Sequence, residues 1–148
     1  MAATTKRRIH GKGPYQHEEY TAGGTITPGM LINLNSAGSV IAHAIAEVPC
    51  VVMLAEEDAL QGNEVGDNYT TSSKKVMCII PAMGSVVNCL CASGETLAIG
   101  DYLTSGGDGT FIKAEAATSG SLNAGAIVQC LETCGTLAAN TLVACRVM

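Results

Sequence analysis

The sequence predicts an all-β protein: a small β-barrel or β-sandwich of about ten short strands, with at most one short helical turn and an extended N-terminal arm. Three observations lead to this prediction. Seventeen glycines in 148 residues indicate many tight turns. Turn signals recur about every eight to twelve residues, between short alternating apolar runs. The chain is 47% apolar but has no Trp and only one Phe, so its core must be packed from aliphatic side chains, Met and Cys.

At this length we expect a single body with an arm, the arm at residues 1–24 and the β-rich body at residues 25–148. Glycines and Pro14 interrupt any periodicity in the arm. The arm holds half of the eight basic residues, whereas the chain from residue 13 on has four basic residues against thirteen acidic ones. A short basic arm therefore precedes an acidic body. It is either a solvated terminus or a segment that orders on a partner.

Aromatic residues also gather in the arm, since two of the four tyrosines in the chain are Tyr15 and Tyr20. Tyrosine is a favoured interface anchor because it buries a large area while ordering few torsions. These side chains either dock on a partner or lie on the arm's own domain. The predicted partner contacts are Lys6, Arg7, Arg8, His10, Tyr15, His17 and Tyr20.

The first half of the body predicts a hairpin and a helical turn. Met30–Asn35 and Ser39–Ala46 alternate on either side of a turn and are expected to pair. Pro49–Met53 is a short apolar strand. Leu54–Leu60 has apolar residues at helical spacing and predicts one or two turns of helix. His43 lies in an apolar run, where a histidine is expected to be a satisfied structural residue.

The second half predicts a succession of strands after a polar loop at residues 61–73. Gly94–Ala114, GETLAIGDYLTSGGDGTFIKA, gives a strand, a Gly-Asp corner, a strand, a hairpin turn and a third strand. Glycine and aspartate suit such reversals because hairpin turns need a positive φ. Residues 114–125 are small and predict a loop. The other predicted strands are Lys74–Ile80, Ser85–Cys91, Ala126–Glu132 and Thr141–Met148.

Seven cysteines, an odd number, and the lack of an apolar export signal predict free thiols in a reducing compartment. The best candidate metal ligands are the pairs Cys89 with Cys91 and Cys130 with Cys134, but there is no Cys-x-x-Cys pair. Residues 56–58 are three adjacent acids, which would splay around a helix. We expect small hydrophobic thiols and no metal, with zinc and a disulfide left as alternatives.

No arrangement of residues predicts an active site. None of the three histidines, His10, His17 and His43, follows a strand with a Ser or Cys elbow, and the sequence has no phosphate-binding or dinucleotide loop. We therefore expect no enzyme and no cofactor. The acidic body disfavours direct contact with nucleic acid, and no apolar run is long enough to predict a membrane span.

Two stretches carry a resemblance to a known family. They are TPGMLINLNSAGSVIAHA and AEEDALQGNEVGDNYTTSSKKVMCIIPAMGSVVNCLCASGETLAIGDYLTSGGDGTFIKA. The features stand in a characteristic order: Pro28-Gly29, Glu56 to Gly62, Ile80-Pro81, Gly94 to Thr110, Ala114 to Gly125 and Val143 to Val147. In this order residues 25–148 resemble the small head-decoration, or cement, proteins of tailed bacteriophages.

The resemblance implies a non-enzymatic protein that binds the outer surface of an assembled head and ties neighbouring subunits of the major capsid protein together. It implies a homotrimer, made in the host bacterial cytoplasm and located on the outer capsid surface of the virion. Terminal arms of such proteins commonly lie across adjoining subunits, so the predicted arm would contact the capsid.

Two alternatives remain open at this stage. Gly94–Ala114 also resembles the hairpins of biotinyl and lipoyl carrier domains, which present a modified lysine at a hairpin tip. Here the tip, at residues 106–109, has no lysine, and Lys113 lies beyond the turn. A small β-barrel hydrolase is the second alternative, and it would need a carboxylate beside His43.

Overall fold

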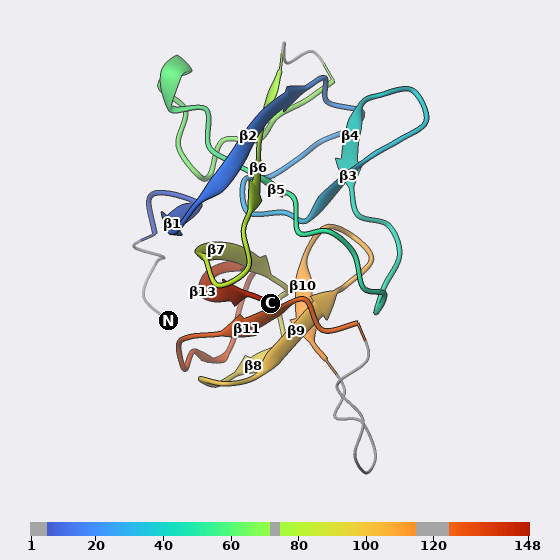
Figure 1. The fold of residues 1–148 in the computed structure, drawn as a ribbon. Helices are drawn as coiled ribbons and strands as arrows, with labels where there is room; N and C mark the ends of the chain where they lie inside the picture. Colours follow the sequence, from blue (N-terminus) through green and yellow to red (C-terminus); the bar gives the residue numbers. More distant parts are fainter. Residues whose placement is uncertain (1–5, 72–74, 115–124) are drawn as a thin grey trace.

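The computed structural model describes residues 6–71, 75–114 and 125–148, and within these ranges the chain is all-β with thirteen strands and one 3-10 helix (Figure 1). This confirms the predicted fold class. The elements are β1 (His10–Lys12), β2 (Tyr15–Tyr20), β3 (Ile32–Leu34), β4 (Val40–Ala42), β5 (Leu54–Ala55), η1 (Ala59–Gln61), β6 (Val76–Pro81), β7 (Val86–Cys91), β8 (Thr96–Leu97), β9 (Tyr102–Ser105), β10 (Phe111–Lys113), β11 (Val128–Cys130), β12 (Gly135–Thr136) and β13 (Thr141–Val147).

Five strands form a closed barrel in the order β7, β10, β9, β11 and β13, and β13 pairs with β7 to complete the ring. The β7–β13 ladder is antiparallel and runs from Thr141 opposite Cys91 to Arg146 opposite Val86. The β10–β7 contact is parallel and pairs Phe111 with Cys91. A five-stranded barrel has a narrow interior, which is why Val, Leu and Cys fill it with a single phenylalanine.

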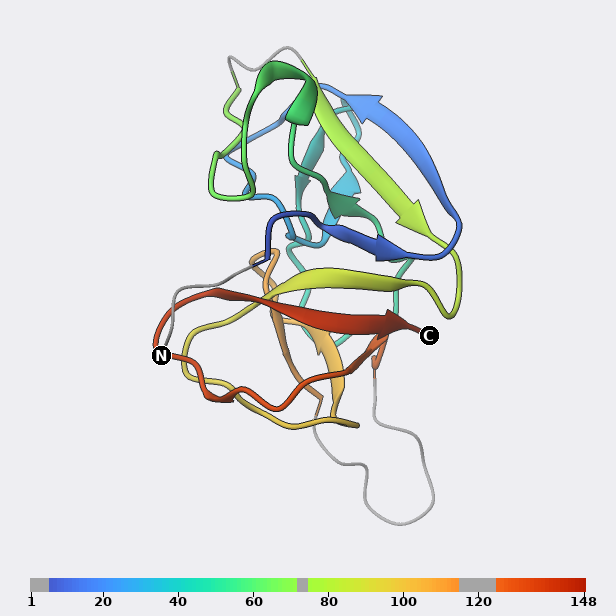
Figure 2. The same ribbon diagram turned by 90° about the vertical axis from the view of Figure 1, so that its left-hand side faces the viewer.

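Strand β1, from the predicted arm, completes the wall of the barrel. β10 pairs with only the last residue of β7, and β1 pairs with the first part of the same strand, with His10 opposite Val87 and Lys12 opposite Val86. Figure 2 shows β1 in dark blue, lying along β7 between the barrel and the sheet of β2 and β6. The division of the chain at residue 24 stays a prediction, but β1 and β2 both belong to sheets of the body.

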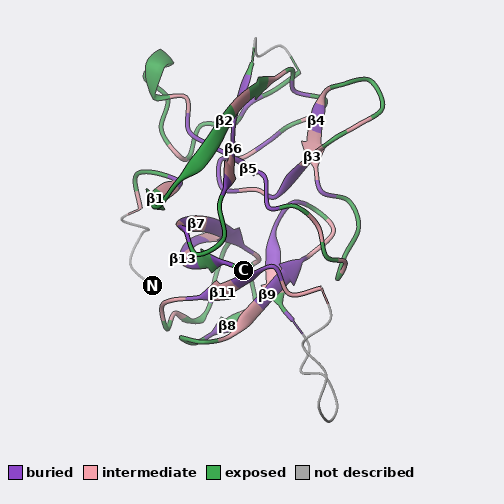
Figure 3. Cartoon of the chain, viewed as in Figure 1, coloured by how far each residue is buried: buried purple, intermediate pink, exposed green. Residues whose placement is uncertain are grey.

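A second lobe, residues 14–81, packs on the barrel. It contains the sheet β2–β6–β5 and the β3–β4 hairpin. The lobes share one core, because Leu31, Leu54 and Ile79 lie in the same buried cluster as the barrel residues. A second cluster lies within the lobe around Val40 and Val76. In Figure 3 the barrel strands are mostly buried, whereas β2 is largely exposed.

The predicted elements agree with the structure in most of the chain. The β3–β4 hairpin and the strands at β6, β7, β11 and β13 are confirmed. The helix predicted at Leu54–Leu60 was wrong at its start, because Leu54 and Ala55 pair with β6 and only Ala59–Gln61 form a 3-10 turn. The strand predicted at Pro49–Met53 was also wrong. The predicted loop at 114–125 lies almost entirely outside the described residues.

Candidate functional site

The candidate site is the N-terminal segment, residues 6–20, which carries every predicted partner contact. Its backbone is fixed at Ile9, whose side chain is fully buried in the main core. The carbonyl of Ile9 accepts a hydrogen bond from the N–H of Asn88 at 2.8 Å. The amide side chain of Asn88 donates to the carbonyl of Arg8 at 2.6 Å. The middle of the segment is therefore an integral part of the barrel.

A buried carboxylate, Glu57, holds the segment from the second lobe. Its Oε2 accepts a hydrogen bond from the N–H of Ile9 at 3.0 Å, and its Oε1 lies 3.6 Å from Nε of Arg8. The Glu57 side chain is 5% exposed, whereas that of Arg8 is 72% exposed. Most of the Arg8 side chain, with its remaining donors, therefore faces outward.

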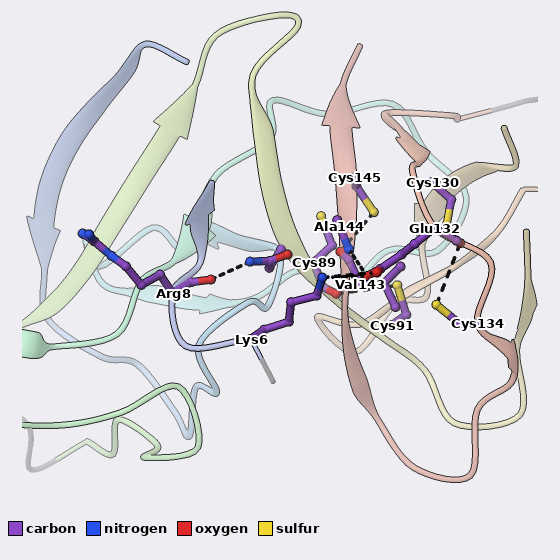
Figure 4. Close-up of polar contacts among 11 residues, drawn as sticks. Lys6, Arg8, Cys89, Cys91, Cys130, Glu132, Cys134, Val143, Ala144 and Cys145 are labelled. Atoms are coloured by element: carbon purple, nitrogen blue, oxygen red, sulfur yellow. Dashed lines mark hydrogen bonds and ion pairs between the residues drawn. The ribbon is translucent and has the colours of Figure 1, made fainter. Parts of the chain in front are cut away.

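Lys6 is held by a different acid (Figure 4). Its Nζ lies 3.1 Å from Oε1 and 3.2 Å from Oε2 of Glu132. The same carboxylate accepts a hydrogen bond from the N–H of Ala144 at 2.8 Å, close to the point where β11 leaves β13. Glu132 thus joins the start of the described segment to the wall of the barrel.

Two further polar contacts involve side chains of β2, one to Glu56 and one within the strand. Nε2 of His17 lies 3.9 Å from Oε2 of Glu56, another buried acid. Burial raises the pKa of Glu56, and the adjacent Glu57 raises it further. The hydroxyl of Tyr20 donates to Glu18, and this hydrogen bond raises the pKa of Tyr20.

The remaining predicted contacts are His10 at the start of β1, Tyr15 at the start of β2 and Arg7 before β1. The rings of His10 and Tyr15 are in contact, with centroids 4.2 Å apart and planes tilted by 43°, and Nε2 of His10 is 2.8 Å from the carbonyl of Gly13. Arg7 is exposed. The structure brings His10 and Tyr15 together, and it pairs Lys6 with an acid of the barrel and Arg8 with an acid of the second lobe.

Sequence reasoning missed the partners of these residues, namely Glu56, Glu57 and Glu132. The first two were considered only as part of an acidic cluster on a helix. Here Asp58, the third member, caps η1 instead, by accepting a hydrogen bond from the N–H of Gln61. The opposite charges of the arm and the body were the available signal, because they favour docking of one on the other.

The cysteines lie mostly in the barrel. Cys89, Cys91, Cys130 and Cys145 are buried there, and Cys50 and Cys134 are half-buried. All of the cysteines are free in the structure. Burial raises the pKa of the Cys89 thiol and of the Cys130 thiol, so both are held protonated. Among the described residues, no group of three or more His, Cys, Asp or Glu side chains is arranged to hold a metal ion.

His43, on which the hydrolase alternative depends, and the hairpin tip, on which the carrier-domain alternative depends, both make structural contacts. Nδ1 of His43 is 2.9 Å from Oγ of Ser105, so this buried histidine has a polar partner and joins the lobe to β9. The hairpin tip packs against the lobe, where the carbonyl of Gly109 accepts from the N–H of Leu31 at 2.8 Å. Lys113 forms an ion pair of 3.0 Å with Asp101. A packed tip without a free lysine does not have the geometry of a carrier domain.

Comparisons with known proteins add one finding about the fold. No family model matches the chain, and no curated protein sequence matches it. A solved structure with a similar fold covers nearly the whole chain. It is the N-terminal base of the head fibre protein gp8.5 of bacteriophage phi29, with a TM-score of 0.57 over 91% of this chain and 95% of that chain. The two sequences are 11% identical, so the likeness concerns the fold alone. No helix among the described residues is long and apolar enough to cross a membrane.

Proposed function

We propose that this protein is a non-enzymatic decoration, or cement, protein that binds the outer surface of an assembled tailed-phage head. In this role it acts as a homotrimer, contacts the major capsid protein and stabilises the contacts between capsid subunits. The observation that carries the proposal is the likeness in fold to the base of a phage head fibre, which extends over nearly the whole of both chains. The order of motifs in the sequence supports the same role independently.

The proposed capsid contact is the outward part of the N-terminal segment. Arg7 and Arg8 present guanidinium groups, and Tyr15 and His17 are exposed on the neighbouring strand. Lys6, His10 and Tyr20 contribute from the same segment while also bonding to their own chain. Because the backbone of this segment is fixed by the barrel, the exposed side chains lose little backbone entropy when they bind.

The mechanism is thermodynamic. A protein that binds the assembled shell but not free subunits stabilises the shell by mass action. Copies joined in a trimer bind several sites at once, and this raises the overall affinity above that of one contact. Lys6 and Arg8 already form ion pairs with their own chain, so their positions are partly set before binding.

The test uses heads of the phage that encodes this chain, prepared without the protein. We expect the wild-type protein to co-sediment with these heads and to protect them against heat. A double variant, R7E with Y15A, is expected to lose most of this binding while keeping its circular dichroism spectrum. The matched control is Leu60→Ser, because Leu60 is exposed on η1 outside the segment.

Two results would contradict the proposal at different levels. Failure of the wild-type protein to bind the heads would reject the decoration role. Full occupancy by the double variant would reject the N-terminal segment as the contact, and it would leave the decoration role standing.

A further inference from the structure

An apolar groove lies on a different part of the surface, between the end of β13 and the segment that leads into β5. It has a volume of about 380 Å³. Every side chain that lines it is apolar or a thiol. The lining residues are Pro49, Cys50, Val51, Val52, Pro81, Met83, Ala126, Ile127, Val147 and Met148.

The rim of this groove carries unusually exposed apolar side chains. Met83 is 82% exposed at the tip of the turn between β6 and β7, and Val51 is 71% exposed. Met148 is 45% exposed beside them. Soluble proteins rarely leave a contiguous apolar patch without a partner. The same face therefore has an apolar groove and, at its rim, exposed apolar side chains that could fill such a groove on another molecule.

One wall of the groove also has free backbone groups. In the described part of the chain, no hydrogen bond joins the backbone of residues 48–52 to any other residue. This run lies just before β5, where pairing with β6 begins at Leu54. A run of unpaired N–H and C=O groups beside an apolar hollow can accept an added strand. It also explains why residues 49–52, most of the strand predicted at Pro49–Met53, form no strand within one copy, whereas the carbonyl of Met53 accepts a hydrogen bond from the N–H of Ile32.

We propose that this groove is the surface through which copies of this chain associate, with a second copy as its occupant. Met83 of one copy enters the groove of the next, and residues 48–52 pair with the backbone of the neighbour. Repeated around a threefold axis, this contact gives the trimer of the proposed function. The inference rests on the self-association included in that function and does not depend on binding to heads.

The chemistry of the lining favours a second copy over a capsid subunit. No charged side chain lines the groove, and interfaces between identical chains are more apolar than transient ones. The candidate capsid contact, by contrast, is polar and basic. Methionine at the rim suits a contact that must fill an irregular hollow, since its side chain is flexible.

The experiment measures mass in solution by sedimentation velocity, across a series of concentrations of the full chain. We expect the wild-type protein to sediment as a multiple of 15.1 kDa. The variants Val51→Asp and Met83→Lys are expected to fall to the mass of one chain. Ile99→Lys is the matched control because Ile99 is 68% exposed and does not line the groove. Thermal unfolding followed by circular dichroism checks that every variant is folded.

Alkylation with iodoacetamide gives a second measurement on the same samples. Cys50 lines the groove and Cys134 does not, and both thiols are half-buried. We expect Cys50 to be modified more slowly in the wild-type protein than in Val51→Asp, whereas the rate at Cys134 stays the same. An equal rate at Cys50 in the two proteins would contradict the inference.

The outcomes separate this inference from the proposed function. A wild-type protein that is monomeric at every concentration, or groove variants that remain oligomeric, would overturn it. If the protein is monomeric and Val51→Asp no longer binds heads, the occupant is the capsid and the inference fails while the function stands. If the protein is oligomeric through the groove but ignores heads, the function fails and the inference stands.

Discussion

Replacing Ile9 with alanine tests whether the start of the chain is part of the folded core. The Ile9 side chain is fully buried in the main core, and its backbone bonds to Glu57 and Asn88 do not depend on the side chain. The substitution removes three carbons, which at about 0.8 kcal/mol each gives about 2.4 kcal/mol. The cavity left behind raises the loss to about 3–4 kcal/mol. For a chain of this length the melting temperature should fall by about 10 °C.

The assay is urea unfolding followed by circular dichroism, with a thermal scan as a second measurement. Ile9→Val should lose about 1 kcal/mol, because it removes a single methylene. Arg7→Ala is the matched control, since Arg7 is exposed two residues earlier in the same segment and should change stability by less than about 0.5 kcal/mol. If Ile9→Ala is as stable as Arg7→Ala, residues 8–12 do not pack on the barrel and the reasoning is wrong.

Three further predictions follow from buried contacts. Glu57→Ala should lower the free energy of unfolding by about 2 kcal/mol, because the N–H of Ile9 loses its acceptor. Gly29→Ala should destabilise strongly, since Gly29 has φ +93° and a Cβ there would lie 2.5 Å from Cδ2 of Leu142. Burial raises the pKa of Cys78 from 9.0 to about 12. The folded state therefore holds this proton more tightly than the unfolded state, so stability is full below pH 9 and falls as the pH rises toward 12.

The measurement in each case is urea unfolding, with a control from the same chain. Glu64→Ala removes an exposed acid and should change little. Gly38 also has a positive φ, but a Cβ there would meet open space, so Gly38→Ala should lower the free energy of unfolding by only about 1 kcal/mol. Cys78→Ala should show a shallower loss of stability above pH 9. Equal effects in Gly29→Ala and Gly38→Ala, or no decline above pH 9, would contradict these predictions.

Local patterns were sufficient to predict most of the strands. Alternation and turn residues identified the β3–β4 hairpin and the strands β7 and β13. They failed at Leu54–Leu60, where apolar residues at helical spacing are divided between β5 and η1. The pairing of Leu54 with Ile79 decides that region, and a contact across so much sequence leaves no local signal.

The candidate site shows the same limit. The sequence indicated which arm residues could bind a partner. It could not show that Lys6 and Arg8 already form ion pairs with Glu132 and Glu57 of the same chain. Ile9 carried no signal either, because a single apolar residue in a charged segment has no periodicity. The apolar groove beside β13 could not be predicted from the sequence either, because its walls come from four separate parts of the chain.

The position of β7 has a consequence for synthesis of the protein. This strand bonds to β1, made long before it, and to β13, made long after it. While the ribosome is still adding the later residues, the side of β7 that β13 will cover has no partner and its apolar face is open to the cell. Such an intermediate is prone to aggregate and is a natural client of chaperones. Slow translation after β7 should therefore lower the yield of soluble protein more than slow translation before it.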